Sequence, residues 1–111
     1  MGMLVNRRRR VAELPVLPSV TVEIVRATDP QRPIHAVVDR MTTETVIVTC
    51  ASGVDALAVA MAPTLDLTFR GPGLEVACTA RPGRRVDDVH GNRCVELVLD
   101  EAAAREVRLL G

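Results

Sequence analysis

The side chains best suited to binding chemistry belong to four consecutive arginines, Arg7, Arg8, Arg9 and Arg10. A guanidinium group is planar and offers paired hydrogen bonds to a phosphate or to the O6 and N7 edge of a guanine, which a lysine ammonium does not. The alternative interpretation is a solvated tail whose charge aids solubility or contacts acidic side chains elsewhere in the chain. The arginine run therefore indicates either a local anion site or a charged tail.

The charge of the chain is divided unevenly along its length. In the 111 residues, 14 arginines and no lysines balance 14 acidic residues, so the net charge is zero. Residues 1–11 carry +4, whereas residues 12–111 hold ten arginines against 14 acids and carry −4. Proteins that bind nucleic acid through bulk charge are strongly basic, and a single aromatic residue, Phe69, leaves little for bases to stack on. Composition thus disfavours an RNA- or DNA-binding protein.

Residue patterns for catalysis and metal binding do not occur in the linear sequence. It has no Gly-x-Ser-x-Gly, no glycine-rich phosphate loop and no His-Glu-x-x-His. Three cysteines are an odd number, which argues against a disulfide framework, and Cys50 and Cys78 lie in apolar runs where a thiol acts as a small hydrophobic side chain. His90 and Cys94 have no third ligand nearby in the sequence. We therefore expect no enzyme, no metal site and no cofactor.

A second group of arginines lies around a polar stretch rich in turn residues, namely Arg81, Arg84, Arg85 and Arg93. Asp87 and Asp88 interrupt this group, so we expect a solvated loop over residues 81–92 with internal ion pairs. His35 alternates with apolar residues and is expected on the surface of its strand.

Alternation of apolar and polar residues predicts several short strands. They cover residues 19–26, 34–39, 45–50, 65–70 and 74–79 and a last strand through 95–99. The dipeptides Asp29-Pro30 and Arg32-Pro33 predict a turn before the second strand. Residues 57–61 are apolar throughout, so periodicity leaves a strand and a short helix both open.

The C-terminal end of the chain predicts a helix over residues 100–110. Asp100 is placed as its N-cap, and Ala103, Val107 and Leu110 share one face. The whole pattern predicts a mainly β fold, a small antiparallel β-barrel of six or seven strands with one C-terminal helix. We expect residues 1–18 to form a flexible basic arm and residues 19–111 to form the barrel domain with its helix.

This arrangement of a basic arm, a six-stranded barrel and a closing helix resembles the PilZ domain, a bacterial receptor module for cyclic di-GMP. The resemblance covers Asn6 to Leu110. The family carries an Arg-x-x-x-Arg motif in the arm, whose last arginine matches Arg10, while Asn6 stands at the first. Its second motif, Asp/Asn-x-Ser-x-x-Gly, matches at Asp39, whereas Met41 and Glu44 stand at the serine and glycine positions.

The resemblance implies a cytoplasmic signalling module that binds cyclic di-GMP through Arg7, Arg8, Arg9, Arg10 and Asp39. The alternative is a degenerate PilZ-like adaptor that has lost the nucleotide pocket and binds a protein partner or a second copy of itself. Met41 and Glu44 favour the alternative, because Met41 has no hydroxyl group and Glu44 brings a negative charge towards a dianion. Since no apolar run approaches the length of a membrane-spanning helix, we expect no membrane insertion.

Overall fold

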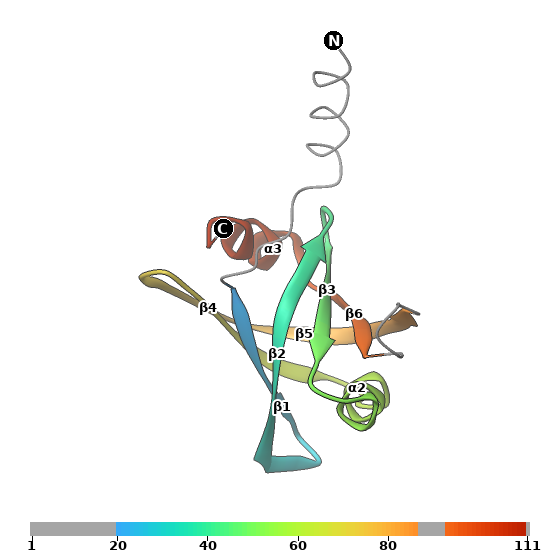
Figure 1. The fold of residues 1–111 in the computed structure, drawn as a ribbon. Coiled ribbons are helices and arrows are strands. Elements are labelled where there is room, and N and C mark those ends of the chain that lie inside the picture. The colour runs from blue at the N-terminus through green and yellow to red at the C-terminus, as the bar shows by residue number, and fades with distance from the viewer. Residues whose placement is uncertain (1–19, 87–92, 111) are drawn as a thin grey trace.

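A computed structural model describes residues 20–86 and 93–110. Within them lie six strands and two helices (Figure 1). The strands are β1 (Thr21–Arg26), β2 (Asp29–Met41), β3 (Thr45–Cys50), β4 (Leu65–Gly71), β5 (Leu74–Val86) and β6 (Cys94–Val98), and the helices are α2 (Gly53–Ala60) and α3 (Glu101–Arg108).

The strands close into one antiparallel barrel in the order β1-β2-β3-β6-β5-β4, and β4 pairs with β1 to complete the ring. Thr21 of β1 lies opposite Val37 of β2 on one side and Arg70 of β4 on the other. In an open sheet the two edge strands carry backbone N–H and C=O groups without a partner. Closure of the barrel pairs β1 with β4, so that neither strand lies at an edge. The predicted fold class, a small barrel with a C-terminal helix, is confirmed.

The barrel interior is filled by aliphatic side chains around one aromatic ring. Phe69 on β4 is fully buried, and its neighbours in the ladders include Val22 and Val76, which are also buried. The β-branched side chains that make up much of this core favour strands and pack well on a pleated surface. No polar or charged side chain is buried among the described residues.

A β-bulge interrupts the alternation of β2 at Asp39. Val38 lies opposite Val48 of β3, but the next paired residue of β2 is Arg40, opposite Ile47, so Asp39 is the extra residue. Both Val38 and Met41 are buried, at 1% exposure, although they are three positions apart. A bulge re-aims side chains in this way. As a result, Asp39 and Arg40 both keep about half of their side-chain surface exposed.

Two strands are longer than the sequence indicates. The turn predicted at Asp29-Pro30 and Arg32-Pro33 is wrong, because β2 already begins at Asp29 and the turn lies at residues 27–28. Residues 30–33 are all exposed, and the β1–β2 pairing passes through an irregularity here, so the prolines interrupt no regular ladder.

The loop expected from residue 81 is also wrong for its first half, since β5 continues to Val86. A register shift between Pro82 and Arg85 lets the strand pass the proline and Gly83 while it stays paired with β6. A Cβ atom at Gly83 would lie 3.2 Å from the Glu96 carbonyl oxygen and 2.6 Å from the mobile Oε1 of the same residue, so the close approach of the two strands favours glycine. Residues 87–92, with Asp87, Asp88 and His90, lie outside the described residues.

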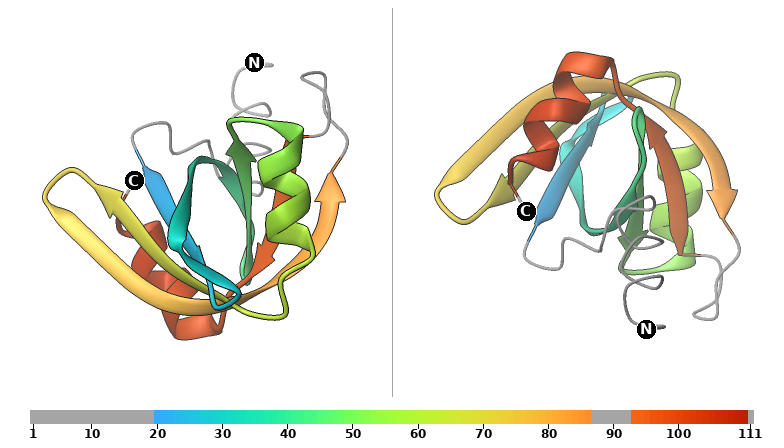
Figure 2. Two further views of the ribbon diagram at one scale, coloured as in Figure 1. Left: turned by 90° about the horizontal axis from the view of Figure 1, so that it is seen from below. Right: turned by 90° about the horizontal axis from the view of Figure 1, so that it is seen from above.

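The sequence left both a strand and a helix open for residues 57–61, and in the structure they belong to helix α2 and its C-cap, Met61. Ser52 caps it by accepting a hydrogen bond from the Asp55 N–H at 3.1 Å, and Ala56 and Val59 are buried against the barrel. Helices α2 and α3 lie at opposite ends of the barrel (Figure 2).

Helix α3 starts where the sequence predicts. The Asp100 carboxylate accepts the Ala103 N–H at 2.7 Å, and Ala103, Val107 and Leu110 are buried. The helix ends at Arg108, two residues before the predicted end, because the Leu110 N–H bonds to Val107 three residues back and tightens the last turn.

The bulge in β2 predicts how the deletion of one residue, Arg40, changes the free energy of unfolding. Removing Arg40 leaves Val38 and Met41 two positions apart, so both stay in the core, and the free energy of unfolding should change by no more than about 1 kcal/mol. Urea unfolding followed by circular dichroism measures this. Deleting Ile47 from β3, which has no extra residue to lose, is the control and should abolish folding. Loss of the folded state on deleting Arg40 would contradict the bulge.

Candidate functional site

The outward face of β2 carries a short row of side chains that differ in chemistry. His35 and Arg40 are exposed, Val37 is 44% exposed, and the Asp39 carboxylate is 43% exposed. Their neighbours Ile34, Ala36 and Val38 point inward, because side chains alternate along a strand. The row therefore places an imidazole, an apolar surface, a carboxylate and a guanidinium along one line. The predicted surface position of His35 is confirmed.

A depression of about 370 Å³ opens on this face. It is lined by Thr21, His35, Ala36, Val37 and Ala51. Its volume lies at the lower end of the range for pockets that take small ligands. Asp39 does not line the depression; it follows Val37 by two positions along β2, towards the β2–β3 turn.

The N-terminal part of the chain joins the barrel beside Asp39. Val20, the first described residue, accepts a hydrogen bond from the Val38 N–H at 3.1 Å. Arg7, Arg8, Arg9 and Arg10 lie outside the described residues, as does the boundary expected at residue 18. The arginines precede Val20 by ten to 13 positions, and an extended chain of that length spans about 30 to 45 Å. They are therefore within reach of Asp39.

Met41 and Glu44 stand at the serine and glycine positions of the second PilZ motif, and they differ in their exposure to solvent. Met41 is buried in the core. Glu44 is exposed, and its carbonyl accepts the Leu99 N–H at 2.8 Å. The only hydroxyl groups of the β2–β3 turn belong to residues that follow Met41, and those of Thr42 and Thr45 bond each other at 2.6 Å. Met41 thus offers no group to a ligand at the surface.

Arg40 is a charged residue of this face that sequence reasoning missed. The predicted strand ended at Asp39, which left Arg40 in the connection to the next strand, whereas β2 continues to Met41 and its bulge turns Arg40 outward. The signal was present, since Val38 and Met41 are spaced by three, and a buried unpaired arginine between them is too costly for a small barrel.

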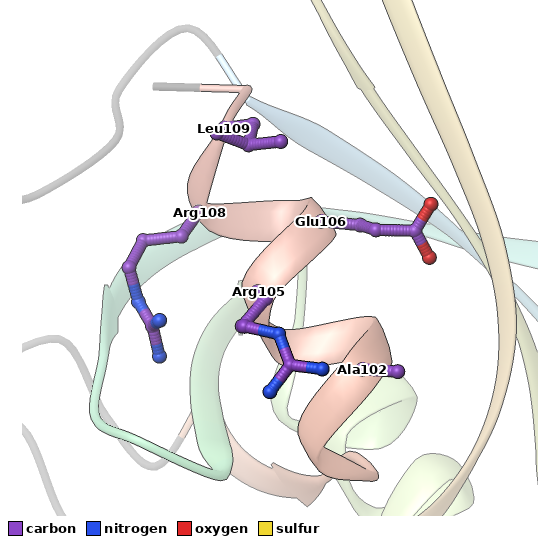
Figure 3. A pocket seen from close by; sticks show the side chains of 5 residues that line it. All are labelled: Ala102, Arg105, Glu106, Arg108 and Leu109. Carbon is purple, nitrogen blue, oxygen red and sulfur yellow. The ribbon is translucent and has the colours of Figure 1, made fainter.

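Helix α3 is fastened to the β2–β3 turn by Arg108. Its guanidinium donates to the carbonyl oxygens of Thr42 at 3.4 Å and Thr43 at 3.2 Å. Figure 3 shows Arg108 and Glu106 extending to opposite sides of the helix, with the Arg105 side chain between them and directed towards Ala102. These residues, with Ala102 and Leu109, line an open depression of about 530 Å³ on α3. The end of the barrel beside Asp39 is therefore coupled to the C-terminal helix.

The cysteines act as the sequence predicts. All three are free thiols, and Cys50 is buried while Cys78 is half-buried. Burial raises the pKa of the Cys50 thiol from 9.0 to about 11, and the negative charge of Asp55 adds to the shift. Burial also raises the pKa of Cys78 to about 11. Both thiols therefore remain protonated at neutral pH, which makes them poor nucleophiles and poor metal ligands.

The second group of arginines does not lie on the outward face of β2. Arg81, Arg84 and Arg85 are exposed along β5, while Arg93 is half-buried.

In residues 20–86 and 93–110 no group of three His, Cys, Asp or Glu side chains is arranged to hold a metal ion. Neither described helix is long and apolar enough to span a bilayer.

Comparisons with known proteins give no relative for this chain. No family model, no curated protein and no solved structure matches it.

The raised thiol pKa values predict how stability changes at alkaline pH. The folded state favours the protonated thiols, so their contribution is fully present below about pH 9 and is lost as pH rises towards about 11. The chain has no lysine and no tyrosine, so few other groups titrate there. Urea unfolding between pH 8 and about 11 should show a falling free energy, and replacing Cys50 and Cys78 by alanine should flatten the fall. An equal slope in both proteins would contradict these shifts.

Proposed function

We propose that the chain is a PilZ-like bacterial signalling module, acting in the cytoplasm, that binds cyclic di-GMP on the outward face of β2. The observation that carries the proposal is the position of Val20, whose bond to Val38 joins the arginine-bearing segment to the barrel beside Asp39. The segment that carries the four arginines thus precedes a residue that is hydrogen-bonded next to the proposed aspartate.

The chemistry of each part fits a different part of the ligand. Guanidinium groups of Arg7 to Arg10 bind the two phosphates or the O6 and N7 edges of the guanines. The Asp39 carboxylate accepts hydrogen bonds from the N1 and N2 donors of a guanine. The depression beside Val37 offers an apolar surface to the flat base. A segment that becomes ordered around its ligand can then change which surface of the barrel a partner meets.

Titration of the intact chain tests the proposal. Cyclic di-GMP should release or absorb heat with micromolar affinity that falls only modestly between two salt concentrations, whereas GTP should bind far more weakly. Arg10→Ala and Asp39→Ala should each weaken binding by roughly 1 to 3 kcal/mol, because each removes a polar contact to a guanine or phosphate. Asp66→Ala, an exposed carboxylate on β4, is the matched control. Unchanged affinity in both site variants would refute the assigned site.

A second candidate function is an adaptor that binds protein without nucleotide. Two observations favour it. Met41, which stands at the serine position, has no hydroxyl group and is buried. Helix α2 also exposes Val54, Leu57 and Met61, at 78%, 46% and 75%, on one face at spacings of three and four. Such a stripe is suited to packing against the same stripe of a second copy.

Light scattering over a range of concentrations separates the two functions. The adaptor requires a dimer that forms as concentration rises, that Met61→Glu dissociates, and whose melting temperature cyclic di-GMP leaves unchanged. Leu109→Glu on α3 replaces an equally exposed side chain and serves as the control. A monomer at every concentration counts against the adaptor.

A further inference from the structure

The bulge at Asp39 brings two opposite charges together on the surface of β2. The Arg40 Nε lies 3.8 Å from Oδ2 of Asp39, which is longer than a hydrogen bond. The side chains are 52% and 43% exposed, so their mutual attraction is weak and easily exchanged for a ligand. Without the bulge the two side chains would point to opposite faces of the strand.

A carboxylate beside a guanidinium is complementary to one base in particular. Guanine presents two donors, N1–H and N2–H, next to two acceptors, O6 and N7. The carboxylate takes the donors and the planar guanidinium takes the acceptors. Adenine has an amino group where guanine has O6, an acceptor at N1 and no amino group at C2. The contacts at O6 and N1 therefore become repulsions, the contact at N2 is lost, and only the contact at N7 is kept.

Two aliphatic side chains lie next to this pair on the outward faces of β2 and β3. Val37 precedes Asp39 on the same face, and Ile47, opposite Arg40 on β3, is half-buried. Val37 also lines the depression on this face, whereas Ile47 does not. A base that packs against one of these aliphatic side chains can direct its polar edge towards Asp39 and Arg40.

We propose that Arg40 is a guanine-reading residue that acts together with Asp39 and makes the site select guanine over adenine. The inference rests on the function proposed above and adds to it a residue of the barrel itself. It assigns the discrimination between cyclic di-GMP and cyclic di-AMP to the Asp39–Arg40 pair, whereas the N-terminal arginines serve either ligand through its phosphates.

Calorimetric titration of the full chain and three variants with both cyclic dinucleotides tests this assignment. Arg40→Ala should lower the affinity for cyclic di-GMP by about 10- to 100-fold and leave that for cyclic di-AMP within about twofold. Arg40→Lys should recover little, because an ammonium lacks the planar pair of donors. Arg32→Ala is the control, since Arg32 lies on the same strand, is 81% exposed and is only 3.9 Å from an aspartate, Asp29. Thermal melts establish that each variant is folded.

The outcomes are distinct. If the parent chain binds cyclic di-GMP and Arg40→Ala binds it equally well, the role of Arg40 is refuted and the proposed function stands. Full recovery by Arg40→Lys also refutes guanine reading, because charge alone then suffices. If the parent chain binds neither dinucleotide, the proposed function and the inference fail together. Should Arg40→Ala melt early, Arg40→Gln replaces it with the same expected loss.

Discussion

The inside-outside alternation of side chains around a closed barrel is the constraint on which this structure depends. The core has one aromatic ring and many small aliphatic side chains, so each inward position must be filled. A register slip of one residue would turn the apolar side chains of a strand from the core to the surface. Strand β2 meets the constraint with a bulge, because Val38 and Met41 must both point inward across an interval of three. The extra residue is what places Asp39 and Arg40 side by side on the surface.

The same end of the barrel is held from two further directions. The chain enters at Val20, whose carbonyl is bound by the Val38 N–H, and α3 reaches the β2–β3 turn through Arg108. The turn is also tied to the start of α3 by the bond from the Leu99 N–H to Glu44. The end of β2 that carries Asp39 is therefore bonded to Val20, where the described part of the chain begins, and through the β2–β3 turn to the C-terminal helix.

Sequence reasoning predicted the parts that depend on local chemistry. The alternation in β3, the Asp100 cap and the buried face of α3 follow from short-range patterns, and all are confirmed. It failed where pairing between strands overrides a local signal. The prolines of β2 and the Pro82-Gly83 pair of β5 read as breaks, yet register shifts absorb them into strands. Arg40 was missed because the predicted strand ended at Asp39, and the spacing of three between Val38 and Met41 was not recognised as a bulge in a strand that continues to Met41.

The central claim is that the outward face of β2 is a ligand surface built by the bulge. The most direct test is to follow the backbone amide signals of the isotopically labelled chain by NMR during titration with cyclic di-GMP. The account predicts shifts concentrated at Thr21, from Val37 to Arg40 and around Ala51, with the β4–β5 turn at residues 71–74 unaffected. Saturable shifts confined to other parts of the barrel, or no shifts at millimolar ligand, would contradict it.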